Sequence, residues 1–160
     1  MSGRIPAHVN QNNLCNDIES TSGVDLRYTL LPQKLKLAGY TTAFVGKSHL
    51  GARSPANLPI NRGFDSHLGF LKGGEDHWTQ GSGSNNNEGP GTIDLWDGDK
   101  PSNQSGTYSG FLYTDRAVKV IRDFVDSLDP TTQLPKAAGG ADKLFMCLLC
   151  STLVKIPRDE

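Results

Sequence analysis

The sequence has few of the features that quickly reveal a protein's class. Its 160 residues contain only Cys15, Cys147 and Cys150, which cannot all pair within the chain and fit neither a disulfide framework nor a zinc site. No apolar run approaches the roughly 20 residues needed to span a bilayer. The first residues, MSGRIPAHVNQNN, lack the hydrophobic segment of a signal peptide. The formal net charge is -1, so we expect no broad attraction to nucleic acid or anionic membranes.

Glycine and proline, by contrast, are plentiful. The chain has 18 Gly and 9 Pro and only 36% hydrophobic residues, which predicts one loop-rich domain. Residues 1–28 are polar and are expected to be irregular, and residues 51–110 show little pattern of regular structure. Within them, residues 73–110 contain GSGSNNNEGPG and DGDKPSNQSG. Such low-complexity text buries little surface, so we predict an insertion loop over one face of the domain.

Two segments in the first third of the chain have a clear pattern. A helix is predicted from about Thr29 to Ala38, with Thr29 as its cap and Gly39 as its left-handed terminator. A strand is predicted from Tyr40 to Val45, because YTTAFV is rich in β-branched and aromatic residues.

Two further segments follow the polar stretch. A second helix is predicted to start at a Thr114 cap and to end before Asp129-Pro130. Its apolar stripe consists of Ala117, Val118, Ile121, Phe124, Val125 and Leu128. The uninterrupted apolar run from Leu144 to Cys150 is typical of a strand buried on both faces, and its two cysteines are interpreted as buried thiols. The order helix, strand, helix, strand predicts an α/β domain with a largely parallel sheet.

The first strand ends on GKSHLG, residues 46–51, which offers two groups for binding an anion. If the strand continued through them, Lys47 and His49 would point to the same side, because side chains two apart share a face. The lysine would supply a point charge, and the histidine a donor or a general acid. By residue type alone, a surface lysine and a loop histidine are the better interpretation of this pattern.

The words GKSHLG and RGFD (residues 62–65), with Gly3-Arg4 before them, resemble the sulfatase family. The resemblance is to the arylsulfatase B-like branch of the alkaline-phosphatase-like superfamily, whose usual word is GKWHLG. It covers residues 3 to about 149, and it implies a partial alkaline-phosphatase-like α/β domain and hydrolysis of sulfate esters. The implied substrates are sulfated carbohydrates or aryl sulfates. Lys47 and His49 then become the implied catalytic and substrate-binding residues, contacting the sulfate group and stabilising its charge.

Three other motifs are interpreted more cautiously. RGFD is interpreted as structural, shaping a cleft wall. The run Glu75, Asp76, His77 and Trp78 resembles the GSEDYY region near the substrate entrance of the family, but an acidic–histidine cluster is more often a solvated loop, and we expect no metal there. Asn103-Gln104-Ser105 fits the N-glycosylation pattern.

The parts of the family's machinery that the sequence does not contain are equally informative. No C-x-P-S-R word, whose cysteine becomes the formylglycine nucleophile, occurs in the 160 residues. The Asp-Asp and Asp-Asn pairs that hold the family's calcium are not found either, nor is the histidine that follows the last apolar strand. We therefore expect residues 1–160 to be a partial catalytic domain that is inactive by itself. The alternatives are a non-catalytic fragment or pseudo-enzyme retaining an anion-binding cleft, and a phosphate- or phosphonate-ester hydrolase of the same superfamily. The resemblance implies a lysosomal or secreted protein, and the oligomeric state stays open.

Overall fold

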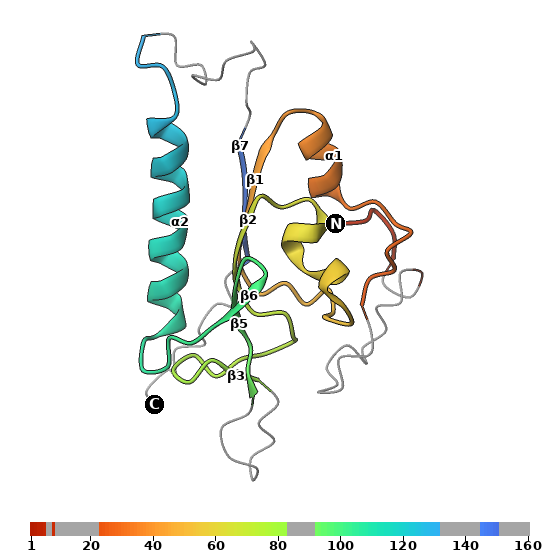
Figure 1. The fold of residues 1–160 in the computed structure, drawn as a ribbon, viewed down its shortest axis with the longest axis vertical. Coiled ribbons are helices and arrows are strands. Elements are labelled where there is room, and N and C mark those ends of the chain that lie inside the picture. Colours follow the sequence, from red (N-terminus) through yellow and green to blue (C-terminus); the bar gives the residue numbers. More distant parts are fainter. Residues whose placement is uncertain (6–7, 9–22, 83–91, 132–144, 151–160) are drawn as a thin grey trace, which may run out of the picture.

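A computed structural model describes residues 1–5, 8, 23–82, 92–131 and 145–150. A five-stranded sheet separates two layers of helix (Figure 1). The long helix α2 (Ser109–Asp126) lies on one side, and α1 (Leu31–Leu37) lies on the other with two short 3₁₀ helices, Pro55–Asn57 and Pro59–Arg62. In the described residues, no helix is both long enough and apolar enough to cross a membrane.

The sheet is mixed, with the strand order β6-β5-β2-β1-β7. β1 (Thr41–Gly46) lies in the centre and runs parallel to β2 (Ser66–Gly69) and to β7 (Phe145–Cys150). The outer strands β5 (Leu95–Asp97) and β6 (Lys100–Ser102) form an antiparallel hairpin on the edge of β2. The α/β class is confirmed, and the parallel part of the sheet comprises β1, β2 and β7.

The prediction that residues 73–110 form an insertion loop is wrong for this hairpin. Leu95 is completely buried in the core, and a left-handed Gly98, with φ +64°, allows the tight turn between the two strands. A second, two-stranded sheet pairs β3 (Gly81–Ser82) with β4 (Thr92–Ile93). Strands of two or three residues within a segment rich in Gly, Asp and Ser have no hydrophobic pattern long enough to predict them from the sequence.

The first helix and the first strand are confirmed with shifted ends. α1 begins after Leu30, whose backbone N–H donates to Gln33 Oε1 at 2.8 Å, so Thr29 is not the cap. A glutamine side chain at the third helical position therefore satisfies an amide at the helix start. Gly39 has a φ of +87° and ends the helix as predicted.

The second helix begins earlier than the sequence predicts, with Tyr108 rather than Thr114 at the cap position. α2 starts at Ser109, and Thr114 lies inside it, where its hydroxyl donates to the Gly110 carbonyl at 2.7 Å. The buried residues of α2 are Ser109, Tyr113 and Ala117. The predicted apolar stripe only partly faces the sheet, since Val118, Ile121 and Val125 are exposed.

The last apolar strand is also confirmed, as β7 pairs in parallel register along the whole of β1. The interpretation of Cys147 and Cys150 as buried thiols concerns side chains outside the described part of the structure, and so does any role of Cys15.

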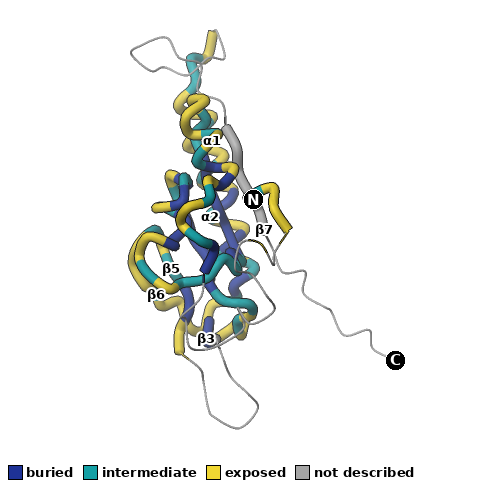
Figure 2. The backbone as a smooth tube through the Cα atoms, turned by 90° about the vertical axis from the view of Figure 1, so that its right-hand side faces the viewer, coloured by how far each residue is buried: buried dark blue, intermediate teal, exposed yellow. Residues whose placement is uncertain are grey.

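The core lies between the sheet and the first half of α2. It is formed by Val45, Leu68, Phe70, Leu95 and Tyr113. Buried positions follow the strands, whereas much of α2 is exposed or half-buried (Figure 2). On the other side of the sheet, Val24 and Leu30 form a smaller cluster with Tyr28 and Leu50 packed against it. Complete burial of one such side chain contributes about 1.5–3 kcal/mol, so the strand preceding GKSHLG is firmly held.

β1 and β2 approach each other unusually closely at their C-terminal ends. A Cβ atom on Gly69 would lie 1.9 Å from the Gly46 carbonyl oxygen, well inside any real contact. Only glycine fits there. This approach brings the residues that follow β1 against those that follow β2, and it therefore determines the arrangement of the candidate site.

The core also contains a histidine, His67, on β2. It is 1% exposed and stacks on Phe44 with ring centroids 5.4 Å apart. Within the described part of the chain neither ring nitrogen has a hydrogen-bond partner. Burial lowers the pKa of His67 from 6.5 to about 4, chiefly because a charged ring would lose its hydration.

We predict that His67 makes the chain less stable in mild acid. Below pH 6.5 the unfolded chain binds a proton at this ring, whereas the folded chain does so only near pH 4. Stability is therefore lost as the pH falls through this window, by about 2 kcal/mol at pH 5. Urea unfolding at pH 7.5 and pH 5.0 measures the loss. In His67→Phe, which keeps the stacking on Phe44, the loss should shrink by this amount; an unchanged pH dependence would contradict the assignment.

Candidate functional site

The two predicted site residues lie just beyond the end of β1 rather than within it. β1 ends at Gly46, and His49 has a left-handed backbone with φ +48°. The expectation that Lys47 and His49 share a face because they lie two apart in a strand is therefore wrong in its reasoning. Both residues are half-buried, and neither lies in the apolar core.

The segment that carries them is attached to the end of β2. Between Lys47 and His49, Ser48 is buried; its N–H donates to the Phe70 carbonyl at 2.9 Å, and its hydroxyl to the Leu71 carbonyl at 3.4 Å. These two hydrogen bonds hold the turn after β1 against the segment that follows β2. Ser48, which occupies the place of the family's tryptophan, thus fixes the backbone of the motif.

The electrostatics of His49 point to a ligand-binding role. Its Nε2 is buried and has no hydrogen-bond partner among the described residues. Burial, and secondly the positive charge of Lys47, lower the pKa of His49 below its ordinary value. The ring is therefore neutral at pH 7. A buried polar atom without a partner costs free energy, which a bound ligand could recover.

A buried aspartate that the sequence analysis did not single out anchors the neighbouring segment. Asp94 Oδ2 accepts hydrogen bonds from the N–H groups of Leu71 and Lys72, at 3.2 and 2.9 Å, and Oδ1 accepts one from Trp96 Nε1 at 3.1 Å. Burial raises the pKa of Asp94, and these donors act against that rise. The alternating apolar residues around it, in TIDLW, were the available signal for a strand in this region.

The RGFD segment has the structural role that the sequence predicts. Arg62 is 4% exposed and donates to the backbone carbonyls of Val24 and Tyr28, at 3.3 and 2.8 Å. Asp65 Oδ2 accepts from the Thr42 N–H at 2.9 Å. Both residues connect loops to the sheet and the layer behind it, and neither is free to bind a substrate.

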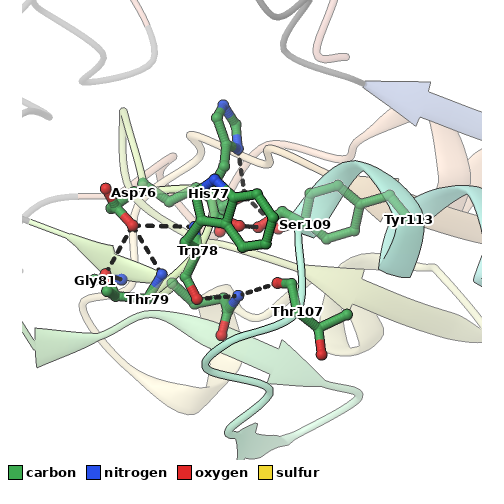
Figure 3. Close-up of polar contacts among 10 residues, drawn as sticks. Asp76, His77, Trp78, Thr79, Gly81, Thr107, Ser109 and Tyr113 are labelled. Atoms are coloured by element: carbon green, nitrogen blue, oxygen red, sulfur yellow. Dashed lines mark hydrogen bonds and ion pairs between the residues drawn. The ribbon is translucent and has the colours of Figure 1, made fainter.

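The GGEDHW segment is not a purely solvated loop, which corrects our expectation for Glu75. Its side chain is fully buried, and Oε1 accepts a 2.7 Å hydrogen bond from the Tyr113 hydroxyl. His77 Nδ1 lies 3.4 Å from the same oxygen (Figure 3). Asp76 and Trp78 are exposed as expected, and Asp76 accepts hydrogen bonds from the backbone of Trp78 and Thr79.

The structure gives the positions of the remaining predicted sites. Asn103 is exposed just beyond β6, and its side chain accepts a hydrogen bond from the Ser105 N–H at 3.0 Å, so glycosylation there stays a prediction. In the part of the chain that the structure describes, no group of three or more His, Cys, Asp or Glu could hold a metal ion. These residues do not fit a calcium site.

Comparisons with known proteins agree on one family. The Sulfatase family model matches residues 1–136. The chain is 37% identical over 108 residues to arylsulfatase J of Mus musculus, a match covering 65% of this chain and 17% of that protein. It is 37% identical over 76 residues to N-acetylgalactosamine-6-sulfatase of the same species, covering 43% of this chain and 14% of that protein.

A solved structure, Ps i-CgsB in complex with k-i-k-neocarrahexaose, has a TM-score of 0.68 to this chain at 22% identity. The match covers 98% of this chain and 33% of that one, so the chain spans about a third of the length of that structure. The fold, the family model and the sequence relatives lead to the same conclusion: this chain belongs to the sulfatase family.

Proposed function

We propose that the chain supplies the sulfate-binding part of an enzyme that hydrolyses sulfate esters. The observation that carries the proposal is the GKSHLG turn at the end of a central strand. It holds a lysine charge and a buried histidine nitrogen that has no partner within the described part of the chain. The carboxyl ends of parallel strands are the usual location of sites in α/β sheets. Membership of the sulfatase family supports the choice of sulfate over other anions.

Lys47 and His49 have distinct roles in this proposal. The ammonium group of Lys47 pairs with the charged sulfate oxygens. His49 donates a hydrogen bond from Nε2 and stabilises the charge that develops as the sulfur–oxygen bond breaks. The Ser48 backbone, held by Phe70, keeps the turn in place so that no reorganisation is needed when the substrate binds.

We propose sulfated carbohydrates or aryl sulfates as the substrate class. The name of the relative N-acetylgalactosamine-6-sulfatase supports a sulfated sugar. Calcium and a formylglycine nucleophile complete the family's site, and both would have to come from residues other than those described. No step of the present proposal passes through them.

Binding of inorganic sulfate tests the proposal directly. We expect saturable binding to the 160-residue chain that weakens about tenfold to a hundredfold in Lys47→Ala, because a charge-assisted hydrogen bond is lost. Isothermal titration with sodium sulfate at constant ionic strength measures it. Lys34→Ala, which removes an exposed lysine on α1, is the matched control. Equal sulfate affinity in the two variants would refute the assignment of Lys47.

A further inference from the structure

Four aromatic rings that contact one another lie in the loop after β2 and at the start of α2, and they have no role in the proposal above. We call His77, Trp78, Tyr108 and Phe111 the aromatic row. The ring centroids of His77, Trp78 and Phe111 lie 5.8, 5.4 and 5.5 Å from that of Tyr108. Trp78 is 57% exposed and Phe111 is 66% exposed. The three rings are inclined to the Tyr108 ring by 62°, 47° and 75°, and the aromatic surface they leave in water can bury a ligand.

The backbone beneath the row is well fixed. Ser109 donates to the His77 carbonyl through its N–H at 2.8 Å and through its hydroxyl at 3.1 Å. The Trp78 carbonyl accepts from the Gly106 N–H at 2.8 Å and from Gln80 Nε2 at 3.2 Å. The rings are therefore presented by two segments that are attached to each other, so little order has to be gained when a ligand binds.

A buried acid lies at the His77 end of the row. Glu75 Oε1 is close to His77 Nδ1, whereas Glu75 Oε2 is buried and has no hydrogen-bond partner among the described residues. Glu75 thus places a buried carboxylate next to His77, whose Nδ1 has no hydrogen-bond partner among the described residues.

The row lies at the same end of the sheet as Lys47 and His49. Its loop follows β2 directly, and Ser48 is hydrogen-bonded to Phe70, the first residue after that strand. The first turn of α2, which carries Phe111, lies toward this end of the molecule (Figure 1). A ligand larger than a sulfate group could therefore extend from the GKSHLG turn toward the row.

We propose that the aromatic row, with the half-buried His77 at one end, binds a sugar ring of a sulfated saccharide. This inference rests on the proposed function and names its substrate class. A pyranose has an apolar face of C–H groups and an edge of hydroxyls, which matches exposed aromatic faces bordered by the half-buried His77. A small aryl sulfate would fill one ring position and would leave the polar groups unused, so the row favours a saccharide.

Binding of a hexasaccharide without sulfate isolates the row from the sulfate site. The probes are a sulfated galactan hexasaccharide and the same hexasaccharide after chemical desulfation, titrated against the 160-residue chain. We expect Trp78→Ala to weaken binding of both about tenfold, because one stacking face is lost. Trp78→Phe should restore most of the affinity. Trp78→Ala should leave binding of inorganic sulfate unchanged.

The controls separate this inference from the proposed function. Lys47→Ala should weaken the sulfated hexasaccharide and leave the desulfated one unaffected. Leu37→Ala removes an exposed apolar side chain on α1, 84% exposed, and should change neither. The inference is overturned if the parent chain does not bind the desulfated hexasaccharide, or if Trp78→Ala binds it as tightly as the parent. If Trp78→Ala weakens binding of both hexasaccharides as expected but Lys47→Ala has no effect on either, only the sulfate site is refuted.

Discussion

Gly69→Ala is expected to prevent the chain from folding. The new methyl carbon would lie 1.9 Å from the Gly46 carbonyl oxygen and 2.7 Å from its carbonyl carbon. These are backbone atoms of the neighbouring strand, so no rotation of a side chain can relieve the clash. Overpacking against side chains costs about 1–3 kcal/mol. A clash that forces two central strands apart should cost more than this, and more than the free energy of unfolding of a typical domain, which is about 5–15 kcal/mol.

Circular dichroism and urea unfolding of purified Gly69→Ala test this expectation. Gly74→Ala is the matched control, because a Cβ there meets nothing within 4 Å, and its stability should stay within about 0.5 kcal/mol of the parent. A folded Gly69→Ala protein with a normal unfolding midpoint would show that β1 and β2 do not depend on this close approach.

The 160-residue chain is expected not to turn over a sulfate ester. Residues that act as a unit in catalysis are strongly non-additive, and loss of the nucleophile alone removes several orders of magnitude of rate. No C-x-P-S-R word occurs in the sequence, and the described residues offer no metal cluster. Lys47 and His49 would then bind sulfate without a reaction to assist.

A chromogenic aryl sulfate provides the measurement. Release of the phenol should equal the rate without protein, while a complete arylsulfatase serves as the positive control. Turnover by the 160-residue chain that disappears in Lys47→Ala would prove the expectation wrong. Turnover that persists in Lys47→Ala would indicate a contaminating enzyme instead.

The elements with strong local patterns could be predicted from the sequence. β1 and β7 carry apolar and β-branched runs, and α2 has a periodic apolar stripe, so their type and order were predictable. Glycines mark the GKSHLG turn as the end of a strand, and the resemblance to the sulfatase family indicates Lys47 and His49 as site residues. Helix ends were less predictable, since the cap of α1 depends on a glutamine side chain rather than on Thr29.

The features that depend on long-range contacts could not be predicted in this way. The β5–β6 hairpin consists of short strands in polar text, and it is held by burial of Leu95 and by pairing with β2. Glu75 has the composition of a solvated loop, and its burial depends on Tyr113, 38 residues later in the chain. In α2 the prediction failed in the other direction: Val118 and Ile121 have the spacing of core positions, but both are exposed.

The buried carboxylate of Asp94 has a consequence for how this domain can change during evolution. Asp94 directly precedes the β5–β6 hairpin and accepts hydrogen bonds from the backbone N–H groups of Leu71 and Lys72. It therefore connects the start of the hairpin directly to the segment that follows β2. Strands β3 and β4 also pair Ser82 with Thr92, so these two positions are held together whatever number of residues separates them. The free energy of closing a segment between two fixed ends grows slowly with its length. A change in the number of residues between Ser82 and Thr92 is therefore expected to leave the GKSHLG turn in place.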